Sequence, residues 1–174
     1  KVKLSLIIPC YNEEETLPFL FNKLEKLICK IDCEIILVDN GSQDNTFKEI
    51  KSFKLKHPNV LSLKLDKNIG YGNGILNGLK ISSGEVFAWT HADMQTDPLD
   101  LITGMKYFDN KDEFVFVKGL RIDRPLSDRF FSIGMSFFSI FILRRFLWDI
   151  NAQPTMFRSI FFEGWNNPPK DFSL

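Results

Sequence analysis

Short apolar runs alternate with helical patterns through the first half of the chain, and no other feature constrains the fold as strongly. The runs with the character of buried strands are 4–8, 34–38, 60–65 and 85–89. The helical patterns between them are 13–28, with acidic residues in its first turn, 46–53, and a stretch ending near 81 behind the glycine-rich residues 68–74. We expect Pro9 to end the first strand. Because parallel strands need crossovers, this order predicts an α/β fold, a Rossmann-like, mostly parallel sheet with helices on both faces.

The second half is less regular. Asp97 and Pro98 predict the start of a helix that continues to about Phe108, and residues 114–117 form a fifth strand pattern. Residues 130–143 are almost wholly apolar, and two arginines follow them. This run is too short to span a bilayer, which takes about 20 helical residues. Residues 130–147 therefore predict either a core helix or an interfacial helix in peripheral contact with a membrane.

Composition predicts one cytoplasmic domain over residues 1–174. The 22 basic and 22 acidic residues balance, so no overall charge favours nucleic acid as a partner. Cys10, Cys29 and Cys33 lack the spacing of a zinc site, and we expect them to be reduced thiols. No signal peptide is expected before Val2, and the chain is expected to continue beyond Leu174.

Two acidic residues follow predicted strands directly. Asp39 comes after the second strand, and the fourth strand runs into His91-Ala92-Asp93. In parallel α/β sheets ligands bind beyond the carboxyl ends of the strands, so Asp39 and Asp93 should share one crevice. His91 and Asp93 could lie near one divalent ion whose shell a diphosphate completes. The alternative is that residues 93–98 are only a helix-capping turn.

Four motifs in a fixed order resemble one family. They are Ser5–Glu14, Ile36–Thr46, Asn68-Ile69-Gly70 and Ala92-Asp93-Met94-Gln95. Together they resemble the family-2 inverting glycosyltransferases of the GT-A fold, and most of all the branch of dolichyl- and polyprenyl-phosphate sugar synthases. The resemblance is dense over residues 2–98 and loose afterwards. It implies a nucleotide-sugar-binding half at 1–98 and an acceptor-side half at 99–174.

The resemblance implies roles for residues on the donor side. Residues implied to bind the nucleotide sugar are Pro9, Tyr11, Glu13, Asp39, Gly70, Ala92, Asp93 and Gln95. Tyr11 would pack near the base, and Asp39 would bind the base or the ribose. Gly70 and the glycines after it would bring the backbone close to the nucleotide. Asn40 stands where the family often has a second Asp.

Asp93 matches the second acid of the family's D-x-D metal motif, and the implied cofactor is Mn²⁺ or Mg²⁺. His91 departs from that motif, in which an Asp is usual. Histidine is a legitimate ligand of Mn²⁺ and suits Mg²⁺ less well. Two interpretations of His91 stay open, a metal ligand and a hydrogen-bonding residue behind the ligands.

On the acceptor side, Arg121 and Arg124 are candidate clamps for phosphate, because guanidinium groups match phosphate geometry. A solvated basic turn is the alternative. Asp171 could serve as the general base that a sugar hydroxyl requires, whereas a lipid phosphate is already an anionic nucleophile and needs none. The alternative for Asp171 is a helix cap. Position alone suggests that residues 153–157 line the acceptor pocket.

Three classes of function follow. The first is a metal-dependent inverting glycosyltransferase that acts in the cytoplasm at the inner face of a membrane. Its donor would be a nucleoside-diphosphate sugar and its acceptor a polyprenyl phosphate, with a sugar hydroxyl of a cell-surface glycan as the alternative acceptor. The second is a nucleotidyltransferase, which the sequence Cys10–Glu13 disfavours because a glycine-rich loop belongs there. The third is a non-catalytic domain that binds a nucleotide or a glycan.

Overall fold

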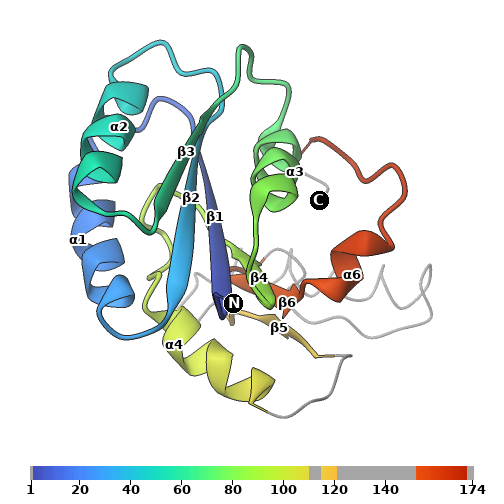
Figure 1. Ribbon diagram of the computed structural model, residues 1–174. Coiled ribbons are helices and arrows are strands. Elements are labelled where there is room, and N and C mark those ends of the chain that lie inside the picture. Colours follow the sequence, from blue (N-terminus) through green and yellow to red (C-terminus); the bar gives the residue numbers. More distant parts are fainter. Residues whose placement is uncertain (1, 110–114, 121–151, 172–174) are drawn as a thin grey trace, which may run out of the picture.

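A mixed β-sheet organises the part of the chain that this computed structural model describes, which is residues 2–109, 115–120 and 152–171. The strands are β1 (Leu4–Cys10), β2 (Cys33–Asp39), β3 (Val60–Lys64), β4 (Val86–Trp89), β5 (Phe116–Lys118) and β6 (Thr155–Arg158). They are arranged in the order β3-β2-β1-β4-β6-β5 (Figure 1). The first four are parallel, and β6 runs antiparallel to both of its neighbours.

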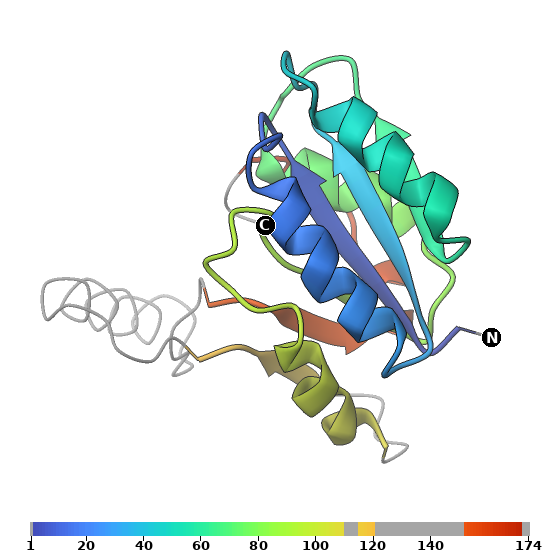
Figure 2. The ribbon, with the colours of Figure 1, turned by 90° about the vertical axis from the view of Figure 1, so that its left-hand side faces the viewer.

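Helices cover both faces of the sheet, as the sequence predicts. They are α1 (Leu17–Ile28), α2 (Thr46–Lys56), α3 (Tyr71–Ile81), α4 (Asp100–Met105), the 3₁₀ turn η1 (Lys106–Phe108) and α6 (Ile160–Glu163). One hydrophobic cluster joins α1, α2 and α4 to one face, and a second joins α3 and the aromatic residues of the α6 region to the other. Figure 2 shows α1 and α2 side by side across their face.

Strand β1 lies at the centre of the first four strands, and all of its residues are buried. Its side chains alternate between the two clusters, since Leu6 and Ile8 belong to one and Ile7 to the other. The prediction that Pro9 ends this strand is wrong, because Pro9 pairs with Val38 inside it. Strand β4 pairs with β1 only as far as Ile7, so Pro9 has a strand partner on one side only.

Several predicted boundaries also differ. The helix expected from Glu13 begins at Leu17, because the acidic residues form a preceding turn whose amide groups bond to the start of α2. The helix expected from Asp97 to Phe108 is split into α4 and η1. Its expected cap, Asp97, accepts a hydrogen bond at Oδ1 from the Leu99 N–H. The fifth strand is displaced to β5, where it pairs with β6.

Glycines let α3 lie directly on β1. A Cβ atom on Gly74 would be 2.9 Å from Pro9 Cβ, and one on Gly78 would overlap with Ile7 Cγ2. Substitution at either position would push the helix away from the sheet. The first turn of α3 is therefore held at a fixed depth beside the carboxyl end of β1.

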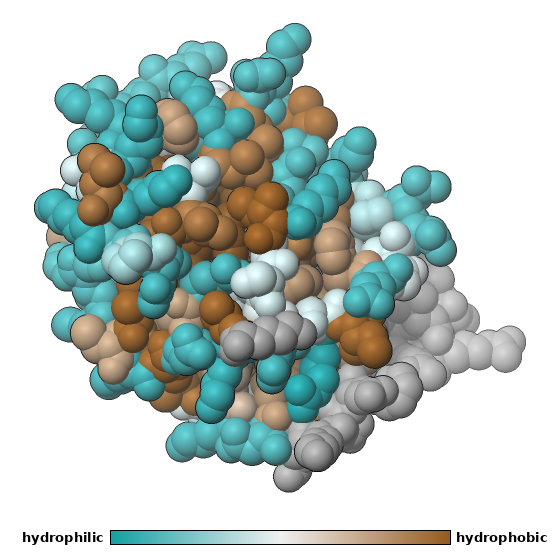
Figure 3. All heavy atoms as spheres, in the orientation of Figure 1, coloured by the Kyte–Doolittle hydropathy of each residue, from teal (hydrophilic) through white to brown (hydrophobic). Residues whose placement is uncertain are grey.

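The surface is mainly hydrophilic in the view of Figure 3, with hydrophobic side chains gathered near its middle, between α2 and α3. Strand β3 forms this edge of the sheet, and its central residues are half-buried. Within the described ranges, no helix combines the length and the apolar character needed to cross a membrane. The apolar segment 130–147 lies outside those ranges.

Candidate active site

A pocket of about 210 Å³ opens at the carboxyl end of the sheet, where the first, second and fourth strands end. The end of β1 and the stretches that follow β1, β2 and β4 line it, together with the residues around the start of α3. The lining residues are Pro9, Cys10, Tyr11, Glu13, Asn40, Asn68, Tyr71, His91, Ala92 and Asp93. The pocket thus brings together parts of all four motifs found in the sequence.

Asp39 and its neighbour Asn40 differ in their position relative to the pocket. Asp39 is fully buried, does not line the pocket, and accepts the Ser42 N–H at Oδ1 over 2.9 Å. Asn40 is 3% exposed and does line it. The crevice that Asp39 and Asp93 were expected to share is therefore shared by Asn40 and Asp93. Asp39 is the last residue of β2, and its Oδ1 is bonded to the Ser42 N–H of the following turn, whereas Asn40 lies just beyond the strand and lines the pocket.

The structure gives a reason for an amide rather than a carboxylate side chain at position 40. Its Nδ2 donates to the Gly70 carbonyl at 3.0 Å and to Asn68 Oδ1 at 3.2 Å. A carboxylate could make neither bond, because it has no proton to donate. Asn40 Oδ1 and Asp39 Oδ2 are buried and have no hydrogen-bond partner among the described residues. Of the two residues only Asn40 lines the pocket, so its Oδ1 can accept a hydrogen bond from a ligand or from water there.

His91 and Asp93 lie together in the pocket, beyond the end of β4. Burial lowers the pKa of His91, and the negative charge of Asp93 only partly opposes this, so the imidazole is neutral near pH 7. Its ring stacks on Tyr71, with centroids 4.6 Å apart and planes inclined by 23°. Asp93 Oδ1 accepts the Gln95 N–H at 3.0 Å.

The loop after β1 forms the outer wall. Tyr11 is 42% exposed, so its ring can cover a flat ligand. The next residue, Asn12, has a positive φ of 55° and is held by Ser42, whose Oγ accepts the Asn12 N–H at 3.0 Å. The Glu13 N–H is bonded to Thr46 Oγ1 at 2.7 Å. These bonds join the loop to the turn after β2 and to the first residue of α2.

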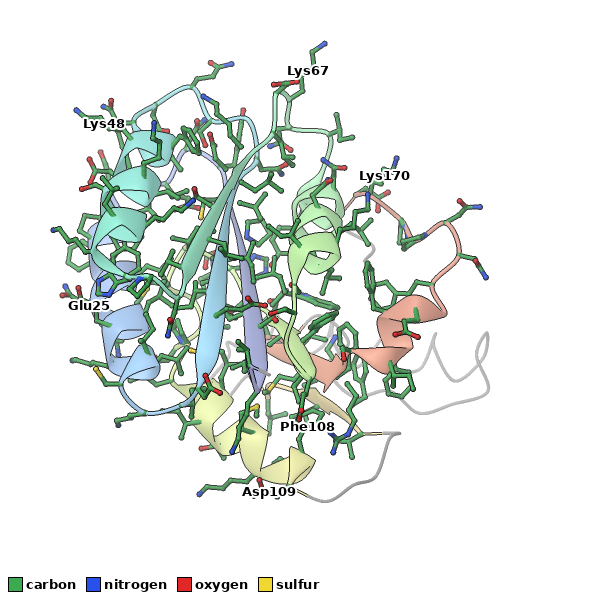
Figure 4. The ribbon with its side chains drawn as sticks, viewed as in Figure 1. Glu25, Lys48, Lys67, Phe108, Asp109 and Lys170 are labelled. Atoms are coloured by element: carbon green, nitrogen blue, oxygen red, sulfur yellow. The ribbon has the colours of Figure 1, made fainter. Side chains whose placement is uncertain are left out.

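Residues 170–171, which are far from the pocket in the sequence, lie beside it. The N–H groups of Gly72 and Asn73, at the start of α3, donate to the carbonyl oxygens of Asp171 and Lys170 at 2.8 and 2.7 Å. Figure 4 labels Lys170 next to this end of α3. At Gly70, a Cβ would lie 2.8 Å from Asp171 Cα and would overlap with the Lys170 carbonyl. In the structure the missing side chain of Gly70 thus makes room for protein, and its role toward a nucleotide stays a prediction.

The predicted site residues fall into three groups. Those that line the pocket are Pro9, Tyr11, Glu13, His91, Ala92 and Asp93. Those that lie beside or beneath it are Asp39, Gly70, Gln95 and Asp171, of which Gln95 and Asp171 are exposed. Arg121 and Arg124 lie outside the described residues. Of the segment expected to line an acceptor pocket, Thr155, Met156 and Phe157 are buried in β6.

Sequence reasoning missed Tyr71 and Cys10. Tyr71 follows the motif Asn68-Ile69-Gly70 directly, and this adjacency is the signal that could have identified it. Cys10 is the last residue of β1, so it reaches the pocket from the strand's end. Burial raises the pKa of the Cys10 thiol, and the charges of Glu13 and Asp39 add to this effect, so the thiol is not a nucleophile at neutral pH.

The donor set of the pocket suits a divalent cation only in part. Asp93 offers a carboxylate and His91 a neutral imidazole, which are both accepted ligands of Mn²⁺. Within the described ranges, no three His, Cys, Asp or Glu side chains lie close enough together to hold a metal ion. The pair therefore fits an ion that takes further oxygen ligands from a bound molecule.

Sequence comparison finds relatives that align with little more than half of this chain. A dolichol-phosphate mannosyltransferase of Pyrococcus furiosus is 35% identical over 97 residues, which are 56% of this chain and 27% of that protein. An undecaprenyl-phosphate 4-deoxy-4-formamido-L-arabinose transferase of Proteus mirabilis is 33% identical over 102 residues, 57% of this chain and 31% of that protein. The aligned part thus spans less than a third of these two relatives.

Structural comparison establishes the fold. The mannosyltransferase PcManGT of Pyrobaculum calidifontis, solved in complex with GDP-Man and Mn²⁺, matches with a TM-score of 0.68 at 18% identity and covers 97% of this chain and 48% of that one. The GT-A fold expected from the sequence is therefore confirmed. The family model of Glycosyl transferase family 2 matches residues 5–166. Because that match covers most of the 174 residues of this chain, the chain belongs to glycosyl transferase family 2.

Proposed function

We propose that this protein is a metal-dependent, inverting glycosyltransferase that moves a sugar from a nucleoside-diphosphate sugar to a polyprenyl phosphate at the cytoplasmic face of a membrane. The names of two relatives, which include dolichol phosphate and undecaprenyl phosphate, support this choice of acceptor. The complex of PcManGT with GDP-Man and Mn²⁺ supports the choice of donor and cofactor.

One observation carries the proposal. Asp93 and His91 line the same pocket as Tyr11 and Asn40, and Asn40 Oδ1 is a buried acceptor without a donor among the described residues. An unsatisfied buried acceptor of this kind costs free energy unless a bound molecule or water supplies an N–H or O–H group. Nucleosides carry such donors on the base and on the ribose. The pocket therefore offers a polar place for a nucleoside beside a place for a cation.

The donor-side roles follow from these positions. Tyr11 covers the nucleoside, and Asn40 accepts a hydrogen bond from it, with Asp39 fixing the turn beneath. Asp93 and His91 would hold a divalent cation, which would supply positive charge against the negative charge of the leaving diphosphate. The half-buried position of both side chains keeps this charge partly shielded from water, which strengthens the interaction.

The acceptor side completes the reaction. A lipid phosphate oxygen attacks the anomeric carbon from the side opposite to the diphosphate, which inverts the configuration at that carbon. An anionic phosphate needs no proton removed, so no general base is required. Arg121 and Arg124, which follow β5, are proposed to bind the phosphates.

One observation favours a second acceptor class. The backbone of Asp171 is fixed by a hydrogen bond, in which its carbonyl oxygen accepts the Gly72 N–H next to Tyr71 of the pocket. A carboxylate held near the pocket in this way could accept a proton from a sugar hydroxyl. The alternative function is therefore transfer to a hydroxyl group of a glycan.

The first experiment tests the donor site by thermal unfolding with GDP and UDP in turn, each with and without Mn²⁺. At least one nucleotide should raise the melting temperature, and Mn²⁺ should raise it further in the unaltered protein. Asp93→Ala should keep the nucleotide effect and lose the part that depends on Mn²⁺. Equal melting temperatures under all conditions would contradict the proposed site.

The second experiment separates the two acceptors. Asp171→Asn keeps the size of the side chain and removes the base, so transfer to a polyprenyl phosphate should continue. No transfer to the polyprenyl phosphate by the unaltered protein, together with transfer to a glycan hydroxyl that Asp171→Asn loses while it melts like the unaltered protein, would instead favour the hydroxyl acceptor. The full-length protein, with radiolabelled nucleotide sugars and undecaprenyl phosphate in detergent, is the right material for this assay.

A further inference from the structure

A histidine that binds a metal is normally oriented by its second ring nitrogen, which donates a hydrogen bond to a carboxylate, a carbonyl group or water. That bond fixes both the tautomer and the direction of the ring. His91 has no hydrogen bond with any described residue, and its ring contact is the stack on Tyr71. The orientation of the imidazole therefore depends on an aromatic face rather than on a polar partner.

Tyr71 is well suited to hold that ring. It is the first residue of α3 and lines the pocket together with His91. Burial raises the pKa of its hydroxyl, which stays protonated at every physiological pH. The hydroxyl oxygen lies 3.3 Å from Gln153 Nε2 and 3.5 Å from Gln153 Oε1, so a residue of the second half of the chain contacts its tip.

The backbone on both sides of Tyr71 is also fixed. Before it, the Gly70 carbonyl accepts the Asn40 amide at 3.0 Å. After it, the amide groups of Gly72 and Asn73 are bonded to the segment 170–171. The first turn of a helix leaves these amides without partners inside the helix, so their bonds to another segment hold the turn in place. The ring of Tyr71 is thus attached to a turn with little freedom to move.

We infer that Tyr71 is a positioning residue that directs the His91 imidazole toward the cation site through their stacked rings. The inference rests on the proposed function, since it assigns His91 to the metal. The inference assigns Tyr71 no direct contact with the cation or the diphosphate. Its effect should appear in the binding of Mn²⁺ and in the coordination of nitrogen, not in the binding of the nucleotide alone.

Pulsed electron paramagnetic resonance of bound Mn²⁺ tests this directly, because a coordinated imidazole gives a ¹⁴N coupling. The sample is the protein with Mn²⁺ and GDP, and then with Mn²⁺ and UDP. In the unaltered protein we expect a ¹⁴N coupling that His91→Ala removes. Tyr71→Phe keeps the aromatic face and should keep both the coupling and the affinity for Mn²⁺. Tyr71→Leu should weaken Mn²⁺ binding about tenfold or more and reduce the coupling, as loss of an outer partner of a metal ligand does.

Phe21→Leu is the matched control. Phe21 stacks on Phe53 with centroids 4.1 Å apart, in the cluster of α1 and α2 and away from the pocket, so its loss removes a stack without touching the site. It should leave the coupling unchanged. If Tyr71→Leu does not fold, Tyr71→Met replaces it. The ring-current shift of the His91 protons, measured by nuclear magnetic resonance in the unaltered protein, checks the stack without any variant.

The outcomes separate the inference from the proposed function. A ¹⁴N coupling and an Mn²⁺ affinity that survive in Tyr71→Leu overturn the inference and leave the metal site intact. Absence of the coupling in the unaltered protein overturns both the inference and the assignment of His91. Weakened Mn²⁺ binding with unchanged binding of the nucleotide alone supports the inference.

Discussion

Replacing Asn40 with aspartate should destabilise the protein in a way that depends on pH. Asn40 is 3% exposed, and its amide donates to Gly70 and Asn68. Asn40→Asp removes both donors and places a carboxylate opposite a carbonyl oxygen. Two lost bonds at roughly 1 kcal/mol each, plus the burial of a charge, give a loss of about 2–4 kcal/mol in the free energy of unfolding near pH 8.

The sign of the pH effect follows from the same geometry. Burial and the facing oxygen atoms raise the pKa of the introduced carboxyl group, so its penalty is present above that pKa and is relieved as the pH falls and the group gains a proton. Asn40→Ala should cost about 1–3 kcal/mol, with no pH dependence of its own, because it leaves the Gly70 carbonyl without a donor and adds no charge. Urea unfolding at pH 5 and pH 8 measures both effects.

An exposed position provides the control for the added charge. Asn59 is exposed and lies just before β3, at the end of the sheet opposite to the pocket, so Asn59→Asp should change stability by less than about 0.5 kcal/mol at either pH. The reasoning is refuted if Asn40→Asp is as stable as the unaltered protein at pH 8. It is refuted equally if the loss for Asn40→Asp is the same at both pH values.

Two further predictions concern the ion pair of Asp97 and the three cysteine thiols. Burial opposes ionisation of Asp97, but the hydrogen bond from Lys23 Nζ at 2.6 Å is among the contacts that outweigh burial and lower the pKa of Asp97. The contribution of Asp97 to stability is therefore present above about pH 4 and is lost as the pH falls through the lowered pKa. Lys23→Met should therefore weaken the dependence of stability on pH at acid pH, and it should lower the free energy of unfolding at pH 7 by at most about 1 kcal/mol. Urea unfolding from pH 2 to pH 7 measures both, and an unchanged dependence at acid pH would contradict the prediction. Iodoacetamide at pH 8, followed by mass spectrometry, should label the exposed Cys29 first, because Cys10 and Cys33 are buried and burial raises the pKa of Cys33 to about 11; early labelling of either buried thiol would refute this.

The parallel half of the fold could be predicted because its signals are local. Each strand from β1 to β4 is a short apolar run, and each crossover helix shows its own periodicity. Strand β6 was not predicted as a strand, although it lies between β4 and β5. Its pairing joins Val86 to Arg158, which are far apart in the sequence, and no local pattern encodes a partner at that distance.

The candidate site was predictable at the level of motifs and not of contacts. Asp93 and Tyr11 could be named because they stand in recognisable sequences, and both line the pocket. The hydrogen bond from the Asn40 side chain to the Gly70 carbonyl and the stack of Tyr71 on His91 could not be predicted, because each joins residues from separate segments of the chain. Which ring faces which depends on the way α3 packs, and the sequence motifs do not contain that information.

The close contact of α3 with β1 extends the functional site well beyond the pocket. Gly78 lies seven residues after Tyr71, which is about 10 Å along a helix, and it packs against Ile7 on the sheet. A larger residue there would shift the whole helix and carry the Tyr71 ring away from His91. Relatives that differ at positions 74 and 78 can thus differ in how they bind a cation while every residue that touches it stays the same. Comparisons of substrate preference within this family should therefore include the contact between helix and sheet as well as the lining of the pocket.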